Sequence, residues 1–113
     1  MADTAPRNKA RKLANARNLA ALANDTKWGE FFSAVERLEL PLQVKLLYED
    51  QAYDMTRVWV PAKNYVDSKN GPELFVFVEW VRASAIEDVS RIARTAGLDY
   101  SLNEAEVTVY GYK

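Results

Sequence analysis

Residues 74–81 read LFVFVEWV, so every position in this stretch except Glu79 is apolar. Successive side chains of a β-strand point to opposite faces, so a strand here presents apolar groups on both of its faces. Such a strand must be covered on both sides, which places it in the centre of a sheet. Glu79 then needs a cationic or hydrogen-bonding partner, and Arg82 and Lys27 are the candidates. We interpret Glu79 as part of a structural pair, because the sequence places no nucleophile or base beside it.

The spacing of apolar residues predicts two helices. Between Asn24 and Pro41 the large apolar residues recur at i, i+3, i+4, i+7 and i+10, which places them on one helical face. These residues are Trp28, Phe31, Phe32, Val35 and Leu38. A second helix is expected from the capping box Ser84-x-x-Glu87 to Gly97, a residue type that is frequent at helix C-termini.

Three further stretches alternate with a period of two and predict strands. They are residues 42–48, 56–60 and 107–112. The polar stretch 49–54 turns the chain, so the first two of these strands are expected to form a hairpin. Together with the central strand they give the order α-β-β-β-α-β. This order predicts an α+β fold in which two helices pack on a mainly antiparallel four-stranded sheet.

Charge divides the chain into two parts, which we interpret as a basic, Ala-rich arm (residues 1–23) and a single domain (residues 24–113). The whole chain has 15 Lys and Arg against 16 Asp and Glu, a formal net charge of -1. The arm carries a net +4 and the domain a net -5, because five basic residues of the arm face only Asp3. These five are Arg7, Lys9, Arg11, Lys12 and Arg17. The composition predicts a frayed arm with helical tendency near residues 10–23, and its charge makes it a candidate anion-binding segment.

The absence of cysteine and histidine excludes whole classes of site. A chain without them has no disulfide, thiolate zinc site, iron–sulfur cluster, Ser-His-Asp triad or imidazole metal ligand. The sequence also lacks a phosphate-binding glycine loop and a calcium loop. We therefore expect no enzymatic activity, no cofactor and no metal. The alternative is an enzyme that uses carboxylates, tyrosine or lysine, with a pocket near Glu79, Tyr110 or Lys27.

Arg57 and Trp59 are the candidate partner-binding residues. They alternate with Val58 and Val60 in a predicted strand, so both are exposed if the two valines point inward. An exposed tryptophan beside an arginine is typical of protein contact surfaces. A covered sheet face is the alternative environment for Trp59, whereas the other two tryptophans are expected in the core.

Three short motifs resemble a family of small bacterial proteins of unknown function. The motifs are Asn24-x-Thr26-Lys27-Trp28, Val78-Glu79-Trp80 and Tyr110-Gly111-Tyr112. The resemblance covers residues 24–112 and leaves the basic arm outside it. It implies a bacterial, cytoplasmic protein with a compact single domain, and it implies no activity, cofactor or site.

These features favour a non-enzymatic module that binds another protein. Immunity proteins and antitoxins are concrete examples, because an acidic domain can mask a basic site on a toxin. The alternative is nucleic-acid binding through the arm, with an affinity that falls as salt rises. Base stacking on Phe75 and Phe77 is a variant of that alternative. No stretch approaches the roughly 20 apolar residues that span a bilayer, so no membrane partner is expected.

Overall fold

A computed structural model describes residues 4–113, and residues 1–3 of the predicted arm lie outside the described residues. Within those residues the chain forms three α-helices, one 3-10 helix (η1) and seven strands. In chain order the elements are α1 (Thr4–Ala16), α2 (Asp25–Arg37), β1 (Leu42–Leu46), β2 (Tyr53–Met55), β3 (Tyr65–Val66), β4 (Glu73–Leu74), η1 (Phe75–Phe77), β5 (Val78–Ala83), α3 (Ile86–Ala96), β6 (Asp99–Leu102) and β7 (Val107–Tyr110).

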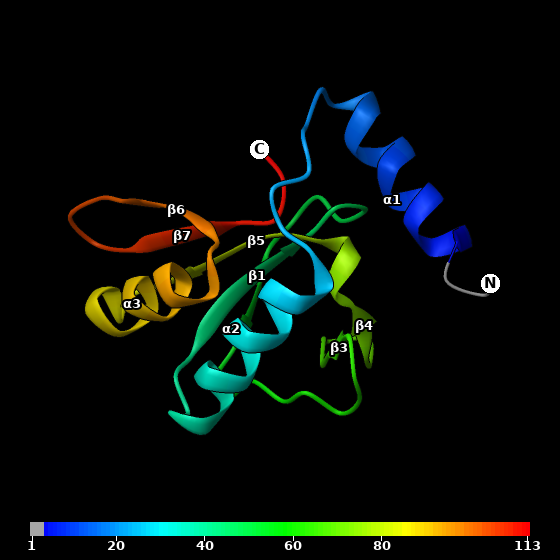
Figure 1. Ribbon diagram of the computed structural model, residues 1–113. Coiled ribbons are helices and arrows are strands. Elements are labelled where there is room, and N and C mark those ends of the chain that lie inside the picture. The colour runs from blue at the N-terminus through cyan, green and yellow to red at the C-terminus, as the bar shows by residue number, and fades with distance from the viewer. Residues whose placement is uncertain (1–3) are drawn as a thin grey trace.

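Five of the described strands form one antiparallel sheet in the order β2-β1-β5-β7-β6. The helices α2 and α3 lie side by side on one face of this sheet (Figure 1), and their apolar faces form the main core with it. The predicted α+β class is therefore confirmed, but the layout of two helices and four strands is wrong. The described chain has a third helix, α1, and the fifth strand of the sheet is β6.

The apolar run around Glu79 supplies the middle strand of the sheet, as predicted, but it is not one continuous strand. Its first residues form β4 and η1, and only β5 lies in the main sheet. The break at η1 buries two phenylalanines in different places. Phe75 stacks on Phe32 of α2, with ring centroids 5.3 Å apart, whereas Phe77 packs in a second apolar cluster with α1. The helical turn η1 therefore lets Phe75 and Phe77 both be buried, on different sides of the chain, as the apolar composition of residues 74–81 requires.

The predicted hairpin partner of β1 at residues 56–60 is wrong. The partner strand is β2, and Leu42 pairs with Met55 while Val44 pairs with Tyr53. Burial alternates along β2, since Tyr53 and Met55 are buried and Asp54 is exposed. After Met55 the chain leaves the sheet and continues as bends and irregular backbone.

The start of α3 also differs from the prediction. Ala85 is the residue that precedes the helix, and no side chain caps it. Ser84 contributes only its carbonyl oxygen, which accepts from the Ile86 N–H at 2.9 Å. The predicted end is confirmed, because Gly97 follows the last helical residue with a φ of 78°. This left-handed conformation favours glycine.

The arm residues from Thr4 onward form α1 and then an extended segment. The helix covers residues 4–16 rather than 10–23, and it turns Ala10 and Ala14 toward Leu47, Phe77 and Tyr112. The extended segment pairs with the C-terminus of the chain, because Ala20 and Lys113 exchange two backbone hydrogen bonds of 3.1 Å. Leu46 lies in the main core, whereas Leu47, just beyond β1, packs with Phe77 and Tyr112 against α1, so α1 lies at the end of the sheet where β1 ends, in a cluster apart from α2 and α3.

Candidate functional site

One face of the sheet is only partly covered, because α1 packs against one end of it. Side chains that alternate with the core residues line this face, which we call the open sheet face. They are Gln43 and Lys45 of β1, Asp54 of β2, Trp80 and Arg82 of β5, Asp99 and Ser101 of β6, and Thr108 and Tyr110 of β7. The cross-strand register aligns them in rows, with Lys45, Trp80 and Tyr110 in one row and Gln43, Arg82 and Thr108 in the next.

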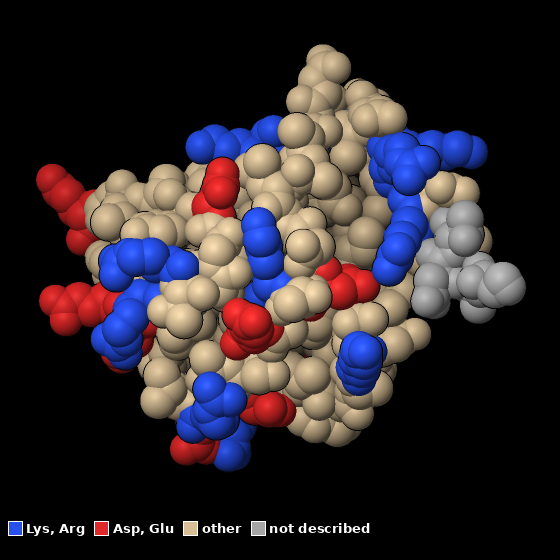
Figure 2. Space-filling view, viewed as in Figure 1, with Lys and Arg blue, Asp and Glu red and all other residues tan. Residues whose placement is uncertain are grey.

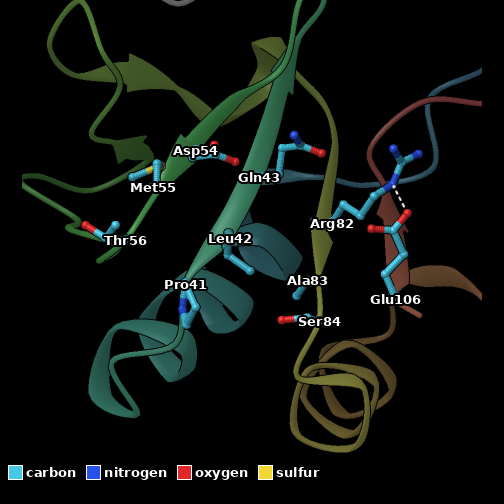
Figure 3. Close-up of a pocket in the computed structure, with 10 residues that line it drawn as sticks. All are labelled: Pro41, Leu42, Gln43, Asp54, Met55, Thr56, Arg82, Ala83, Ser84 and Glu106. Carbon is cyan, nitrogen blue, oxygen red and sulfur yellow. Dashed lines mark ion pairs between the residues drawn. The ribbon is translucent and has the colours of Figure 1, made fainter.

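Arg82 is held in a fixed position on the open sheet face. Its guanidinium carbon lies 4.2 Å from the ring centroid of Trp80. Its Nε donates to Thr108 Oγ1 at 3.0 Å and lies 3.4 Å from Glu106 Oε1. Figure 3 shows the Arg82 side chain extending toward Glu106, on the side away from Asp54. Stacking and ionic contacts together fix a side chain that is otherwise flexible.

A hollow of about 430 Å³ lies at the end of the sheet where β1 begins and β5 ends. We call it the sheet-end hollow. It is lined by Pro41, Leu42, Gln43, Asp54, Met55, Thr56, Arg82, Ala83, Ser84 and Glu106 (Figure 3). Its charged residues are Asp54, Arg82 and Glu106, so the lining carries a net charge of -1. Within residues 4–113 Asp54 forms no ion pair, whereas Arg82 and Glu106 pair with each other.

Glu79 is buried beside the open sheet face and contacts two cationic side chains, the buried Lys45 and the half-exposed Arg17. Arg17 donates to its two carboxylate oxygens at 2.7 and 3.1 Å, and Lys45 Nζ donates to Oε1 at 2.9 Å. Burial alone raises the pKa of Glu79, but the hydrogen bonds from Arg17 and Lys45 outweigh it and lower that pKa from its ordinary 4.5. The same contact raises the pKa of Arg17. The carboxylate is therefore held in its charged form.

The predicted partners of Glu79, Arg82 and Lys27, are both wrong. Glu79 is the extra residue of a β-bulge, because Lys45 pairs with Trp80 while the next residue of β1 pairs with Val78. The bulge turns the Glu79 side chain toward Lys45, and α1 brings Arg17 to the same place. Neither a bulge nor a docked N-terminal helix is encoded in the local pattern around Glu79.

The three sequence motifs meet at Gly111. The N–H groups of Gly111 and Tyr112 both donate to the carbonyl oxygen of Glu79, at 2.8 and 3.0 Å. A β-carbon added at Gly111 would overlap the carbonyl oxygen of Val78 and lie 3.1 Å from Cζ2 of Trp28. Glycine is therefore required here for close packing rather than for an unusual φ.

The remaining motif residues also make structural contacts. Asn24 accepts from the Lys27 N–H at 2.8 Å and caps α2, and Tyr112 donates its hydroxyl to Val76 O at 2.7 Å. Tyr110 OH and Ser101 Oγ lie 2.9 Å apart on the open sheet face. Thr26, in contrast, is exposed.

Trp59 is exposed although its backbone is held in place. Its relative exposure is 55%, whereas Val58 beside it is buried at 2%. Asp67 N–H donates to Trp59 O at 2.8 Å, and Val60 N–H donates to Glu36 Oε2 at 3.0 Å. Next to it, Arg57 pairs with Glu39 at the end of α2. We call Leu38, Glu39, Arg57 and Trp59 the Trp59 surface.

A family model for a family of unknown function, DUF6678, matches residues 10–113. The chain belongs to this family. The DUF6678 match begins within α1, so it includes Arg11, Lys12 and Arg17, which the resemblance left outside. No curated protein and no solved structure matches the chain.

The basic residues of the arm have three kinds of environment in this DUF6678 protein. Arg17 pairs with Glu79, and Arg7 lies 3.6 Å from Asp25. Lys9 lies over the rings of Tyr48 and Phe77, at 5.7 and 5.9 Å from their centroids. Arg11 and Lys12 are exposed on α1. Figure 2 shows basic side chains gathered over α1, at the upper right of the view.

Base stacking on Phe75 and Phe77 is ruled out, because the two rings are buried at 1% and 6% exposure. Among residues 4–113 no group of three or more Asp and Glu is arranged to hold a metal ion. No helix in the same part of the chain is long and apolar enough to cross a membrane.

Sequence reasoning missed the sheet-end hollow of this DUF6678 protein. Trp80 and Arg82 are two residues apart in a strand, so their shared face could have been predicted. The contributions of Asp54 and Glu106 depend on how β2 and β7 pair with their neighbours, and no local signal reveals that register.

Proposed function

We propose that this protein is a non-enzymatic, cytoplasmic module that binds another protein, with a role comparable to that of an immunity protein or an antitoxin. The exposure of Trp59 carries the proposal. Tryptophan and arginine are the residue types most enriched among energetically important interface residues. Trp59 and Arg57 are exposed together, and hydrogen bonds at Trp59 O and Val60 N–H anchor the backbone of this segment.

The exposed part of Trp59 is large enough to anchor a complex. A buried tryptophan contributes up to roughly 250 Å² of contact, so covering the exposed half removes on the order of 100 Å² from water. At about 25 cal/mol per Å² this contributes roughly 2.5 kcal/mol. The ordered backbone reduces the entropy lost on binding, which favours association further.

The charge of the chain favours a basic partner. Residues 24–113 carry a net -5, and Glu39, Asp54 and Glu106 lie on the Trp59 surface and the sheet-end hollow beside it. The two areas adjoin, because Thr56 lines the hollow and Arg57 is the next residue. Acidic charge around an aromatic anchor attracts a basic protein and speeds its association.

The test is co-purification with the product of the neighbouring gene, followed by affinity measurement. A stoichiometric complex is expected, and Trp59→Ala should weaken it about 30-fold, which corresponds to ~2 kcal/mol. Leu102→Ala is the matched control, because Leu102 is 58% exposed on β6, the opposite edge of the sheet from β2. The proposal fails if no complex forms or if the two variants bind equally well.

Nucleic-acid binding through α1 is the second candidate function. It is supported by the helix itself, which buries Ala10 and Ala14 and leaves Arg11 and Lys12 exposed. Binding to a generic DNA duplex should weaken steeply with salt, and Arg11→Glu with Lys12→Glu should abolish it. An affinity unchanged in that double variant would reject α1 as the binding element.

A further inference from the structure

We propose that the sheet-end hollow binds the basic side chain of a lysine or arginine. That this side chain comes from a protein partner rests on the proposed function, whereas the site itself rests on the geometry of the hollow. The volume of about 430 Å³ lies within the range of small-ligand pockets. The hollow is open, so a side chain from another molecule can enter it (Figure 3).

The lining matches the two parts of a long basic side chain. Pro41 is exposed at the sheet end, and the small exposed parts of Leu42, Met55 and Ala83 (3%, 8% and 5%) line the hollow beside it. Lysine and arginine bury their methylene stems along such surface while the charged group remains near polar atoms and water. An entirely polar hollow would leave the stem without contacts, and an entirely apolar one would not accept the charged group.

Oxygen acceptors are available around the hollow. Asp54 and Gln43 are directly paired across β2 and β1, which brings their side chains close together on one face. Within the described chain neither these side chains nor the hydroxyls of Thr56 and Ser84 take part in a hydrogen bond. A lysine ammonium has three donors and an arginine guanidinium has five, and both groups need several acceptors at once.

Arg82 does not neutralise these acceptors. Its guanidinium is held over Trp80 and against Thr108 and Glu106, on the side of the hollow away from Asp54 (Figure 3). To reach Asp54 it would have to give up all three contacts. The charges of Arg82 and Glu106 cancel each other, so Asp54 leaves the hollow with a net charge of -1. This net charge favours a cation over an anion.

The experiment is an NMR titration of the full chain with capped single residues at constant ionic strength. N-acetyl-lysine amide and N-acetyl-arginine amide are the two basic probes, and N-acetyl-norleucine amide and N-acetyl-citrulline amide are their neutral counterparts. We expect saturable shifts at Gln43, Asp54, Thr56 and Ser84 with the basic probes, and binding at least severalfold weaker with the neutral ones. Comparison of the two basic probes shows whether the hollow prefers an ammonium or a guanidinium.

Asp54→Asn tests the role of the free carboxylate. An exposed ion pair contributes up to ~1 kcal/mol, so this variant should weaken binding of the basic probes about two- to fivefold. Asp99→Asn is the matched control, since Asp99 is an exposed acid at the far end of β6 and should leave binding unchanged. Neutral probes that bind as well as basic ones, non-saturable shifts, or equal losses in the two variants would overturn the proposal.

The outcome is separable from that of the proposed function, because the probes require no partner. If the hollow binds basic side chains and Trp59→Ala leaves partner binding intact, the site stands and the Trp59 surface is rejected as the anchor. If the hollow binds no basic probe while Trp59→Ala weakens the complex, the protein-binding function stands and the hollow is rejected.

Discussion

Arg17 and Glu79 are 62 positions apart in the chain, yet two hydrogen bonds of 2.7 and 3.1 Å join their side chains. This pair connects the end of α1 to the bulge of the central strand, where Lys45 also reaches the carboxylate. Together with the Arg7–Asp25 contact, these three side chains add polar links to the apolar contact of α1 at Ala10, Ala14 and Phe77.

Replacing Arg17 with alanine should lower the free energy of unfolding by about 1–2 kcal/mol. The loss is limited because the Arg17 side chain is 46% exposed and Lys45 still pairs with Glu79. Urea denaturation measures the effect, with Arg11→Ala as the control because Arg11 bonds only to Asn8 within α1. Equal stabilities of the two variants would contradict a stabilising role for the Arg17 contact.

Replacing Glu79 with glutamine should cost more, about 3 kcal/mol, because it leaves the buried Lys45 ammonium without a counter-ion. The cost should depend on pH. The pKa of Glu79 is lowered in the folded protein, so its contribution is complete above the unfolded value and is lost as pH falls through the folded value. The stability difference between the native protein and Glu79→Gln should therefore be constant above pH of about 5 and shrink below it. A difference that grows as the solution is acidified would contradict this sign.

Gly111→Ala should destabilise the protein by more than about 3 kcal/mol, because the added methyl group overlaps Val78 O and presses on the Trp28 ring.

Gly71→Ala provides a contrast to Gly111→Ala. Gly71 has a φ of 104° but no atom within 4 Å of an added β-carbon, so only backbone strain opposes the change. That variant should lose about 1 kcal/mol. Thermal unfolding of the two variants compares them, and a similar small loss at both positions would show that Gly111 is not sterically required.

The elements with a strong apolar period were predictable from the sequence. Trp28, Phe31, Phe32 and Val35 are buried on one face of α2, as their spacing indicates, whereas Leu38, the fifth residue of that pattern, follows the helix and is 51% exposed. The central position of β5 followed from its apolar run, because only neighbours on both faces can cover such a strand. The prediction that Trp80 lies in the core is wrong, because Trp80 is only partly buried on the open sheet face of β5.

The weakly patterned elements were not predictable. The strand β6 reads DYSL and is held by pairing with β7, so its own residues carry little strand signal. The stretch 56–60 alternates like a strand, yet its alternation orients Trp59 outward and Val58 inward without any pairing in the sheet. The sheet-end hollow is lined by residues of four segments, around positions 41–43, 54–56, 82–84 and 106. Their alignment depends on pairing between strands that are far apart in the sequence, so no local pattern predicts it.

Ala10→Gln should release α1 while the rest of the fold remains intact. Ala10 is 1% exposed against the cluster of Leu47, Phe77 and Tyr112, where a longer polar side chain does not fit. Glutamine is a good helix former, so the variant tests docking rather than helix propensity. Backbone amides of α1 should exchange at nearly unfolded rates while those of α2 and β5 stay protected, because these elements belong to the separate main core. Ala5→Gln, at an exposed position of the same helix, is the control and should leave α1 protected. If protection in α2 falls together with that in α1, the two clusters unfold as one unit and α1 is an integral part of the core rather than a docked element.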